Sequence, residues 1–131
     1  MVNWPYPVDV KCDDHTSRKN CPVKLGQVYC DGFFKKGKIG VFSHFHSDHI
    51  APIENCIGEY DIILAHKTTF DAIIAVKPGL RHREQWVTQD DYGQHLTTAS
   101  GEKIRLLKAN HIPGSVQIHV ETDNDTCLYS G

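Results

Sequence analysis

Four side chains that can bind a metal ion fall within six consecutive residues: His44, His46, Asp48 and His49. In an extended loop, residues two apart project to the same side, so His44 and His46 can bind one ion while Phe45 packs away from it. Asp48 and His49 lie beyond the bend and can bind a second ion. Imidazole and carboxylate together suit zinc, and also manganese or iron, and argue against an all-oxygen calcium or magnesium site. The alternative is a polar loop whose histidines only cap a strand end, which this spacing seldom produces.

The elements that must position these residues can be predicted from the hydrophobic pattern. The apolar segment 39–42 predicts a buried strand that ends at Ser43, and α/β sheets commonly place their sites at such C-terminal ends. Further strands are predicted at 27–33, 61–65, 104–107, 116–120 and 127–129. Helices are predicted at 50–57 and 68–76, the second capped by Thr68 or Thr69. Residues 1–24 read as loop with at most one short strand, so the whole predicts α/β layers.

A further histidine, His111, follows the predicted strand 104–107 and precedes a Pro-Gly turn, so it too lies at a strand end. The alternative for His111 is a histidine that is hydrogen-bonded within a loop. His66 and His119 have suitable chemistry without suitable placement, and we expect solvated or supporting roles for them. His119 lies in an alternating strand and is expected to face away from the site.

Length and composition limit the classes of protein to which the chain can belong. The 131 residues predict one domain, and 40% hydrophobic with 23% charged residues is ordinary for a globular protein. The net charge of -2 gives no general attraction to nucleic acid or anionic membranes. No apolar run approaches roughly 18 residues and the start lacks a signal-peptide pattern, so no membrane partner is expected. Five widely spaced cysteines without a C-x-x-C pair favour a reducing, cytoplasmic or nuclear compartment.

Two weaker patterns involve other polar side chains. One possible second zinc site combines three cysteines with a histidine: Cys12, His15, Cys21 and Cys30. Their gaps fit no common finger spacing, and buried apolar roles explain such cysteines equally well. The other pattern is a set of basic residues near two turns: Lys35, Lys36, Lys38, Arg81 and Arg83. Short basic groups are usually solvated, so they are weak candidates for nucleic-acid binding.

The stretch VFSHFHSDHIAPI (41–53) resembles the signature of the metallo-β-lactamase superfamily, whose members are metal-dependent hydrolases with an αββα sandwich fold. Together with KIRLLKANHIPGSVQIHVE (103–121) and TCLYSG (126–131), it resembles the β-CASP nucleases in content and order. The DNA cross-link-repair branch is the most similar, because the RNA 3′-end-processing branch usually has Gly where Asn110 stands. The likeness extends from about Val28 to Gly131.

The resemblance implies a set of metal ligands. His44, His46 and His111 would hold the first ion, and Asp48 and His49 would contribute to the second. Two zinc ions are implied, with manganese or iron as alternatives. A metal-bound hydroxide would then attack a phosphodiester bond without a dedicated protein base.

The resemblance also implies that Asp31 supports the site, so Asp48 and Asp31 are the candidate catalytic carboxylates. Outside the family, an aspartate before glycine is an ordinary turn signal. The implied activity is that of a DNA-repair exonuclease, with DNA favoured over RNA as partner. The alternatives are an RNA-processing nuclease, a thioester, lactone or lactam hydrolase, and a non-catalytic metal-binding module.

Residues 1–131 are expected to be the N-terminal part of a metallo-β-lactamase-type αββα domain, roughly its first half. In the resembled family, a metal-bridging aspartate follows a Ser-Gly or Thr-Gly pair, and here the sequence ends at Ser130-Gly131. We therefore expect the chain alone to be inactive and to bind at most one zinc tightly. An uncovered apolar sheet face is expected to mediate association.

Overall fold

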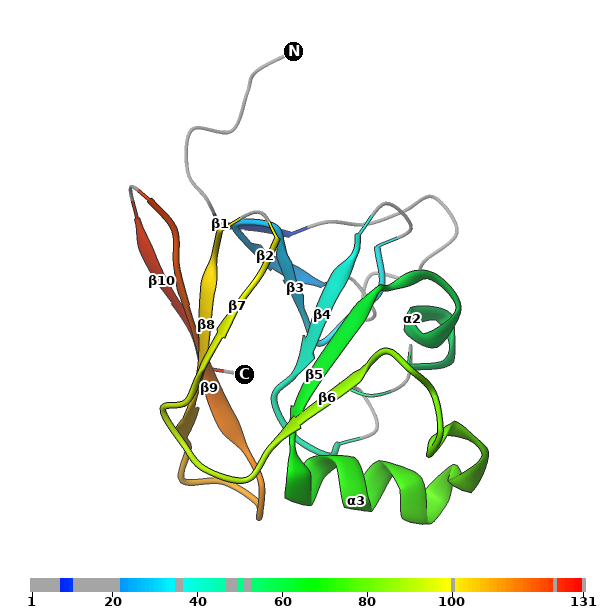
Figure 1. Ribbon diagram of the computed structural model, residues 1–131. Helices are drawn as coiled ribbons and strands as arrows, with labels where there is room; N and C mark the ends of the chain where they lie inside the picture. The colour runs from blue at the N-terminus through cyan, green and yellow to red at the C-terminus, as the bar shows by residue number, and fades with distance from the viewer. Residues whose placement is uncertain are drawn as a thin grey trace.

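The computed structural model describes residues 8–10, 22–34, 37–46, 50, 53–99, 101–123 and 125–130. In this part of the chain two β-sheets pack face to face, with helices on one side (Figure 1). The first sheet has the order β1 (Val8–Val10), β2 (Val23–Leu25), β3 (Val28–Cys30), β4 (Ile39–Phe42), β5 (Ile62–His66) and β6 (Trp86–Gln89). The second has the order β10 (Thr126–Tyr129), β9 (Val116–Glu121), β8 (Lys103–Lys108) and β7 (His95–Thr97). The helices are α2 (Ile53–Glu59), α3 (Lys67–Val76) and the 3-10 helix η2 (Pro78–Leu80).

The direction of the strands brings several chain segments to one end of the sandwich. Strands β3, β4, β5 and β6 run parallel to one another, β2 pairs antiparallel with β3, and β1 pairs antiparallel with β2. Parallel strands end at the same edge of a sheet, so the segments that follow β3, β4 and β5 meet there. The second sheet is antiparallel throughout.

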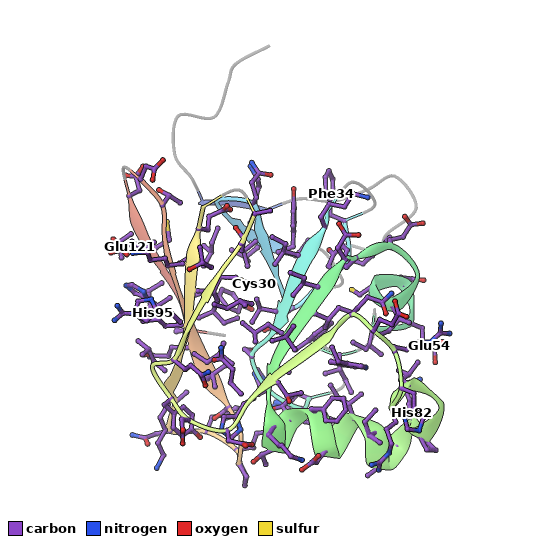
Figure 2. The ribbon with its side chains drawn as sticks, viewed as in Figure 1. Cys30, Phe34, Glu54, His82, His95 and Glu121 are labelled. Carbon is purple, nitrogen blue, oxygen red and sulfur yellow. The ribbon has the colours of Figure 1, made fainter. Side chains whose placement is uncertain are left out.

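The space between the two sheets is filled by apolar side chains from both. Strands β8 and β9 alternate buried with less buried residues, because successive side chains point to opposite faces. Cys30 lies in this interior between the sheets (Figure 2). The buried residues of the second sheet that face the first are Ile104, Leu106, Val116, Ile118, Val120 and Cys127.

Helices cover the outer face of the first sheet. A second apolar cluster forms there from residues of β4, β5, α2 and α3, with Tyr60 among its largest buried side chains. The ring of Tyr60 lies directly on β4, since a Cβ at Gly40 would come within 2.5 Å of it. In the part of the chain that the structure describes, no helix is long and apolar enough to cross a membrane.

The outer face of the second sheet is not covered by any helix among the described residues. Instead of the expected apolar surface, it carries mainly polar side chains, of which His95 and Glu121 point outward in Figure 2. The cause is the two-residue alternation, which sends the apolar residues of β8 and β9 inward. Leu128, 54% exposed, is an apolar exception. A second helical layer, and association through this face, stay predictions.

Most elements agree with the sequence pattern, with three corrections. Residues 1–24 contain β1 and the start of β2, where at most one strand was expected. Strands β6 and β7 were not predicted. Helix α3 is capped by His66, whose Nδ1 accepts a hydrogen bond from the backbone N–H of Thr68, and not by a threonine. The capping residue is the last residue of β5, because β5 leads into α3 without a loop.

Candidate metal centre

Two loops at the same end of the sandwich carry the three histidines. His44 and His46 follow β4, and His111 lies in the connection between β8 and β9. The backbone N–H of Val116, the first residue of β9, donates a hydrogen bond of 2.8 Å to the carbonyl of Ser43. This bond between the two sheets joins the end of one loop to the start of the other, which brings the histidines beside one another.

The three imidazoles form a compact cluster. Their ring centroids are 4.7 Å (His44 to His46), 4.9 Å (His44 to His111) and 4.7 Å (His46 to His111) apart. The rings stand nearly perpendicular to one another, with interplanar angles of 82°, 85° and 89°. One nitrogen from each ring can be chosen so that all three lie within 4.8 Å of one another. The sequence indicated these three residues as candidate metal ligands, and the structure places them together.

One pair of nitrogens in the cluster already has the separation that a small cation requires. His111 Nε2 and His46 Nδ1 are 3.3 Å apart. Tetrahedral zinc with Zn–N distances of about 2.0–2.1 Å separates its nitrogens by roughly 3.3 Å. His44 is 5% exposed, whereas His46 is more open to solvent and His111 is exposed. The cluster is therefore buried on the side of His44 and open to solvent on the side of His111.

A buried carboxylate orients His44 through a serine. Asp31 Oδ1 accepts a hydrogen bond of 2.7 Å from the backbone N–H of Ser43, and Asp31 Oδ2 accepts one from the Ser43 hydroxyl. Because that hydroxyl donates its hydrogen to Asp31, it can only accept from His44 Nδ1, which lies 2.8 Å away. Nδ1 of His44 then carries the hydrogen, so Nε2 is the nitrogen with the electron pair in the ring plane. Such contacts behind a ligand fix its tautomer and ring orientation.

Asp31 itself is held from both sheets. Its backbone N–H donates to the carbonyl of Val41 at 2.9 Å, and the Tyr129 hydroxyl donates to Asp31 Oδ2 at 3.0 Å. Its φ of 54° lies in the left-handed region, which aspartate tolerates better than bulkier residues. The end of β10 thereby reaches the site, and Ser130 lines a cavity of about 330 Å³ together with His44, His46 and His111.

Several predicted site residues lie elsewhere or outside the described residues. Asp48, His49, Lys35 and Lys36 lie outside them, as do Cys12, His15 and Cys21 of the possible second zinc site. Lys38 precedes β4 and so lies at the opposite end of this four-residue strand from His44. Arg81 and Arg83 precede β6, at the same far end. The structure therefore does not bring Lys38, Arg81 or Arg83 together with the histidines.

The remaining cysteine and histidines have structural surroundings. Cys30 is buried between the sheets, and that burial, with a smaller contribution from the charge of Asp31, raises the pKa of its thiol well above the usual value. His66 caps α3 and is buried. His119 lies on the outer face of β9, as the alternation predicted.

Two residues of this site were not predicted from the sequence. Ser43 stands directly before the histidines, and its place between a strand and a candidate ligand was the signal that could have marked it. Tyr129 lies 98 residues from Asp31, so no local pattern connects the two. Their contact depends on the packing of one sheet on the other.

Comparisons with known proteins define the class of fold. No protein-family model matches the chain, and a search of curated proteins found no match. A solved structure of the metallo-beta-lactamase fold protein YhfI from Bacillus subtilis has 20% identity and a TM-score of 0.59, covering 85% of this chain and 53% of that one. A structure of the chemotaxis sensor ODP has 17% identity and a TM-score of 0.52, covering 75% of this chain and 48% of that one. The chain thus has a metallo-β-lactamase fold and spans about half the length of both structures.

Proposed function

We propose that His44, His46 and His111 form the first metal site of a metal-dependent hydrolase. The observation that carries this proposal is the convergence of three imidazoles from two loops, with His44 buried and the other two more open to solvent. Structural zinc sites are closed by four protein ligands, whereas catalytic zinc keeps three and leaves a position open. Three converging nitrogens beside solvent therefore favour catalysis over a purely structural metal.

The chain's own residues would hold and orient the metal. Nε2 of His44 would be the atom that binds the ion, because Ser43 and Asp31 fix the hydrogen on Nδ1. A zinc ion there would lower the pKa of a bound water toward neutrality and so supply the nucleophile. Asp48 and His49 are proposed for a second ion. Zinc is favoured, and iron and manganese stay alternatives; the neighbouring ODP structure is described as a peroxy diiron species of that sensor.

The proposed substrate is the phosphodiester backbone of nucleic acid. The support is sequence similarity to β-CASP nucleases at 41–53, 103–121 and 126–131. Asn110 before His111 favours the DNA-repair exonuclease branch over the RNA-processing branch. Hydrolysis of a thioester, lactone or lactam is the alternative within the same fold, because the metal motif is shared by those chemistries.

The test is an assay of the full-length product that carries these 131 residues. It uses 5′-labelled single-stranded DNA and RNA, a lactam and a thioester, each with and without chelator. We expect DNA to be cleaved, cleavage to stop on chelation, and Asp48→Ala to abolish it with little loss of stability. Efficient lactam or thioester hydrolysis with intact oligonucleotides would replace the nuclease proposal. Metal binding without any turnover would favour the non-catalytic module.

The 131-residue chain alone should behave differently from a longer protein that contains it. We propose that it is inactive alone and binds at most one zinc ion tightly, since His44, His46 and His111 supply one site. Metal analysis of the purified chain measures this directly. Two tightly held ions per chain, together with cleavage of DNA, would show that the chain contains a complete site.

A further inference from the structure

We propose that the first turn of α3 positions His111, through contacts of Thr69 with Gly114. This inference rests on the proposed function, because it concerns the placement of a proposed metal ligand. The imidazole of His111 is exposed, and its ring contacts in the described structure are with His44 and His46. An exposed side chain follows its backbone, so the anchor of the loop helps to decide where His111 points.

The anchor is a close contact between the loop and the helix. The hydroxyl of Thr69, which is fully buried, donates a hydrogen bond of 3.0 Å to the carbonyl of Gly114. Gly114 has a φ of 83°, and a Cβ there would lie 2.8 Å from Cβ of Thr68 and 2.9 Å from the backbone nitrogen of Thr69. The loop backbone therefore rests directly on the start of α3, with no room for a side chain.

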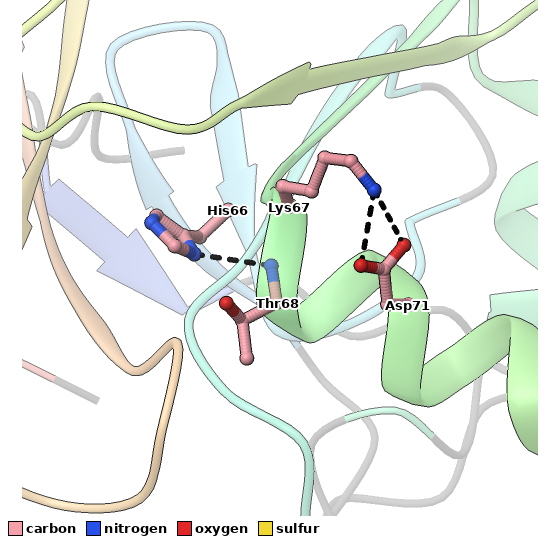
Figure 3. A network of polar contacts seen from close by, with 4 residues as sticks. All are labelled: His66, Lys67, Thr68 and Asp71. Carbon is pink, nitrogen blue, oxygen red and sulfur yellow. Dashed lines mark hydrogen bonds and ion pairs between the residues drawn. The ribbon is translucent and has the colours of Figure 1, made fainter.

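The helix start is itself a fixed platform. His66 Nδ1 accepts from the N–H of Thr68 at 3.1 Å (Figure 3), so His66 Nε2 carries the hydrogen and donates to the carbonyl of Asp90 at 3.0 Å. The ring of Tyr92 stacks on His66 with 4.8 Å between centroids. Because His66 is the last residue of β5, the first turn of α3 is tied to the sheet whose neighbouring strand, β4, leads to His44.

The loop transmits this placement to His111 because it is closed on itself. Ala109 donates a backbone hydrogen bond of 3.2 Å to Ser115, and the Ser115 hydroxyl donates one of 3.1 Å back to the Ala109 carbonyl. Ser115 also donates its backbone N–H to Ile112 at 3.0 Å. Residues 109–115 therefore move together, and a shift at Gly114 displaces His111 relative to the other two histidines.

The first test substitutes glycines with matched backbone conformations. Gly114→Ala and Gly93→Ala both place alanine at a left-handed φ, 83° and 80°, but at Gly93 nothing lies within 4 Å of the new Cβ. Cobalt(II) is titrated into the full chain and followed by its visible absorption, which reports the ligand geometry. We expect Gly114→Ala to weaken binding at least about tenfold and change the spectrum, as lost supporting contacts do at metal sites. Gly93→Ala should bind as the unsubstituted chain does, and equal affinities for both variants would overturn the inference.

The second test removes only a hydroxyl. Thr69→Val deletes the bond to Gly114, Thr69→Ser keeps it, and Thr98→Val deletes a buried hydroxyl hydrogen-bonded to Glu102 at the far end of the sandwich. We expect Thr69→Val to weaken cobalt binding about tenfold, with Thr69→Ser and Thr98→Val close to the unsubstituted chain. If Thr98→Val weakens binding as much as Thr69→Val, the effect is general loss of stability and the inference is wrong.

Amide hydrogen exchange without metal separates this inference from the proposed function. The inference predicts faster exchange in 109–115 for Thr69→Val than for Thr98→Val, whether or not cobalt binds. Unchanged exchange in that loop would overturn it. If instead the loop loosens as expected but the unsubstituted chain binds no cobalt, the positioning stands and the metal site is refuted.

Discussion

Among the described residues, each end of the sandwich buries one carboxylate, and one of the two is connected to the candidate metal site. At the histidine end, Asp31 is 6% exposed and accepts hydrogen bonds from Ser43 and Tyr129. At the opposite end, Glu102 is 4% exposed and accepts from the backbone N–H of Gln27 and the hydroxyl of Thr98. Burial and the type of group are therefore almost the same at both ends.

The two carboxylates differ in the residues that their hydrogen-bond networks reach. The partners of Glu102 belong to two turns, β2–β3 and β7–β8, so this carboxylate joins the sheets at their far end. The network of Asp31 continues through Ser43 to His44 and reaches the cavity that the other histidines line. A buried acid alone thus indicates architecture, whereas a buried acid connected to converging, partly exposed donors indicates a binding site.

The largest expected effect is on metal binding at the histidine end. His44→Ala removes one of three converging nitrogens, and we expect zinc affinity to fall by more than the ten- to hundredfold that is typical for a supporting residue. A zinc competition titration measures this, with His95→Ala on the outer sheet face as the control. A His44→Ala chain that binds zinc as tightly as the control would remove the proposed site.

Asp31 should have a smaller effect of the same kind. Asp31→Asn keeps a short side chain that tolerates the left-handed backbone, so it isolates the lost charge. We expect zinc affinity to fall by about ten- to hundredfold, since the orientation of His44 through Ser43 is weakened. The same titration decides it, and unchanged affinity would make Asp31 an architectural residue like Glu102.

Glu102 should affect stability without affecting metal binding. Glu102→Ala leaves the N–H of Gln27 without its carboxylate partner in a partly buried position, at a cost of about 1–3 kcal/mol. Denaturant unfolding measures the loss as a lower midpoint with an unchanged slope. Zinc affinity measured on the same protein should not change; a matching loss of affinity would erase the distinction between the two ends.

The smallest effect is expected on the helical surface, away from both ends. Glu54 on α2 forms an exposed ion pair of 2.7 Å with Lys77, whose hydrogen bond and charge lower the pKa of the glutamate. A lowered folded-state pKa means that the pair stabilises the fold above the ordinary glutamate pKa and that this contribution is lost as pH falls through the lowered value. Glu54→Gln should therefore be slightly less stable near neutral pH and equal to the unsubstituted chain in acid. Unfolding curves at both pH values compare them, and a difference that grows in acid would contradict the assignment.

The strands that precede the candidate ligands could be predicted from the sequence better than the contacts that position these histidines. The apolar run before Ser43 and the one before His111 are local signals, and both strands end where expected. Strand β6 has no alternating pattern and exists because its backbone pairs with β5. The contacts of Tyr129 with Asp31 and of Thr69 with Gly114 join residues 98 and 45 positions apart. Such pairs depend on sheet packing and on the absence of a Cβ, which no short motif encodes.

The central claim is that His44, His46 and His111 bind one metal ion, and anomalous diffraction from crystals grown with zinc tests it most directly. The account predicts a strong peak at the zinc edge, about 2.0–2.1 Å from one nitrogen of each of these three residues. A peak that contacts other residues, or no peak within reach of all three imidazoles, would contradict it.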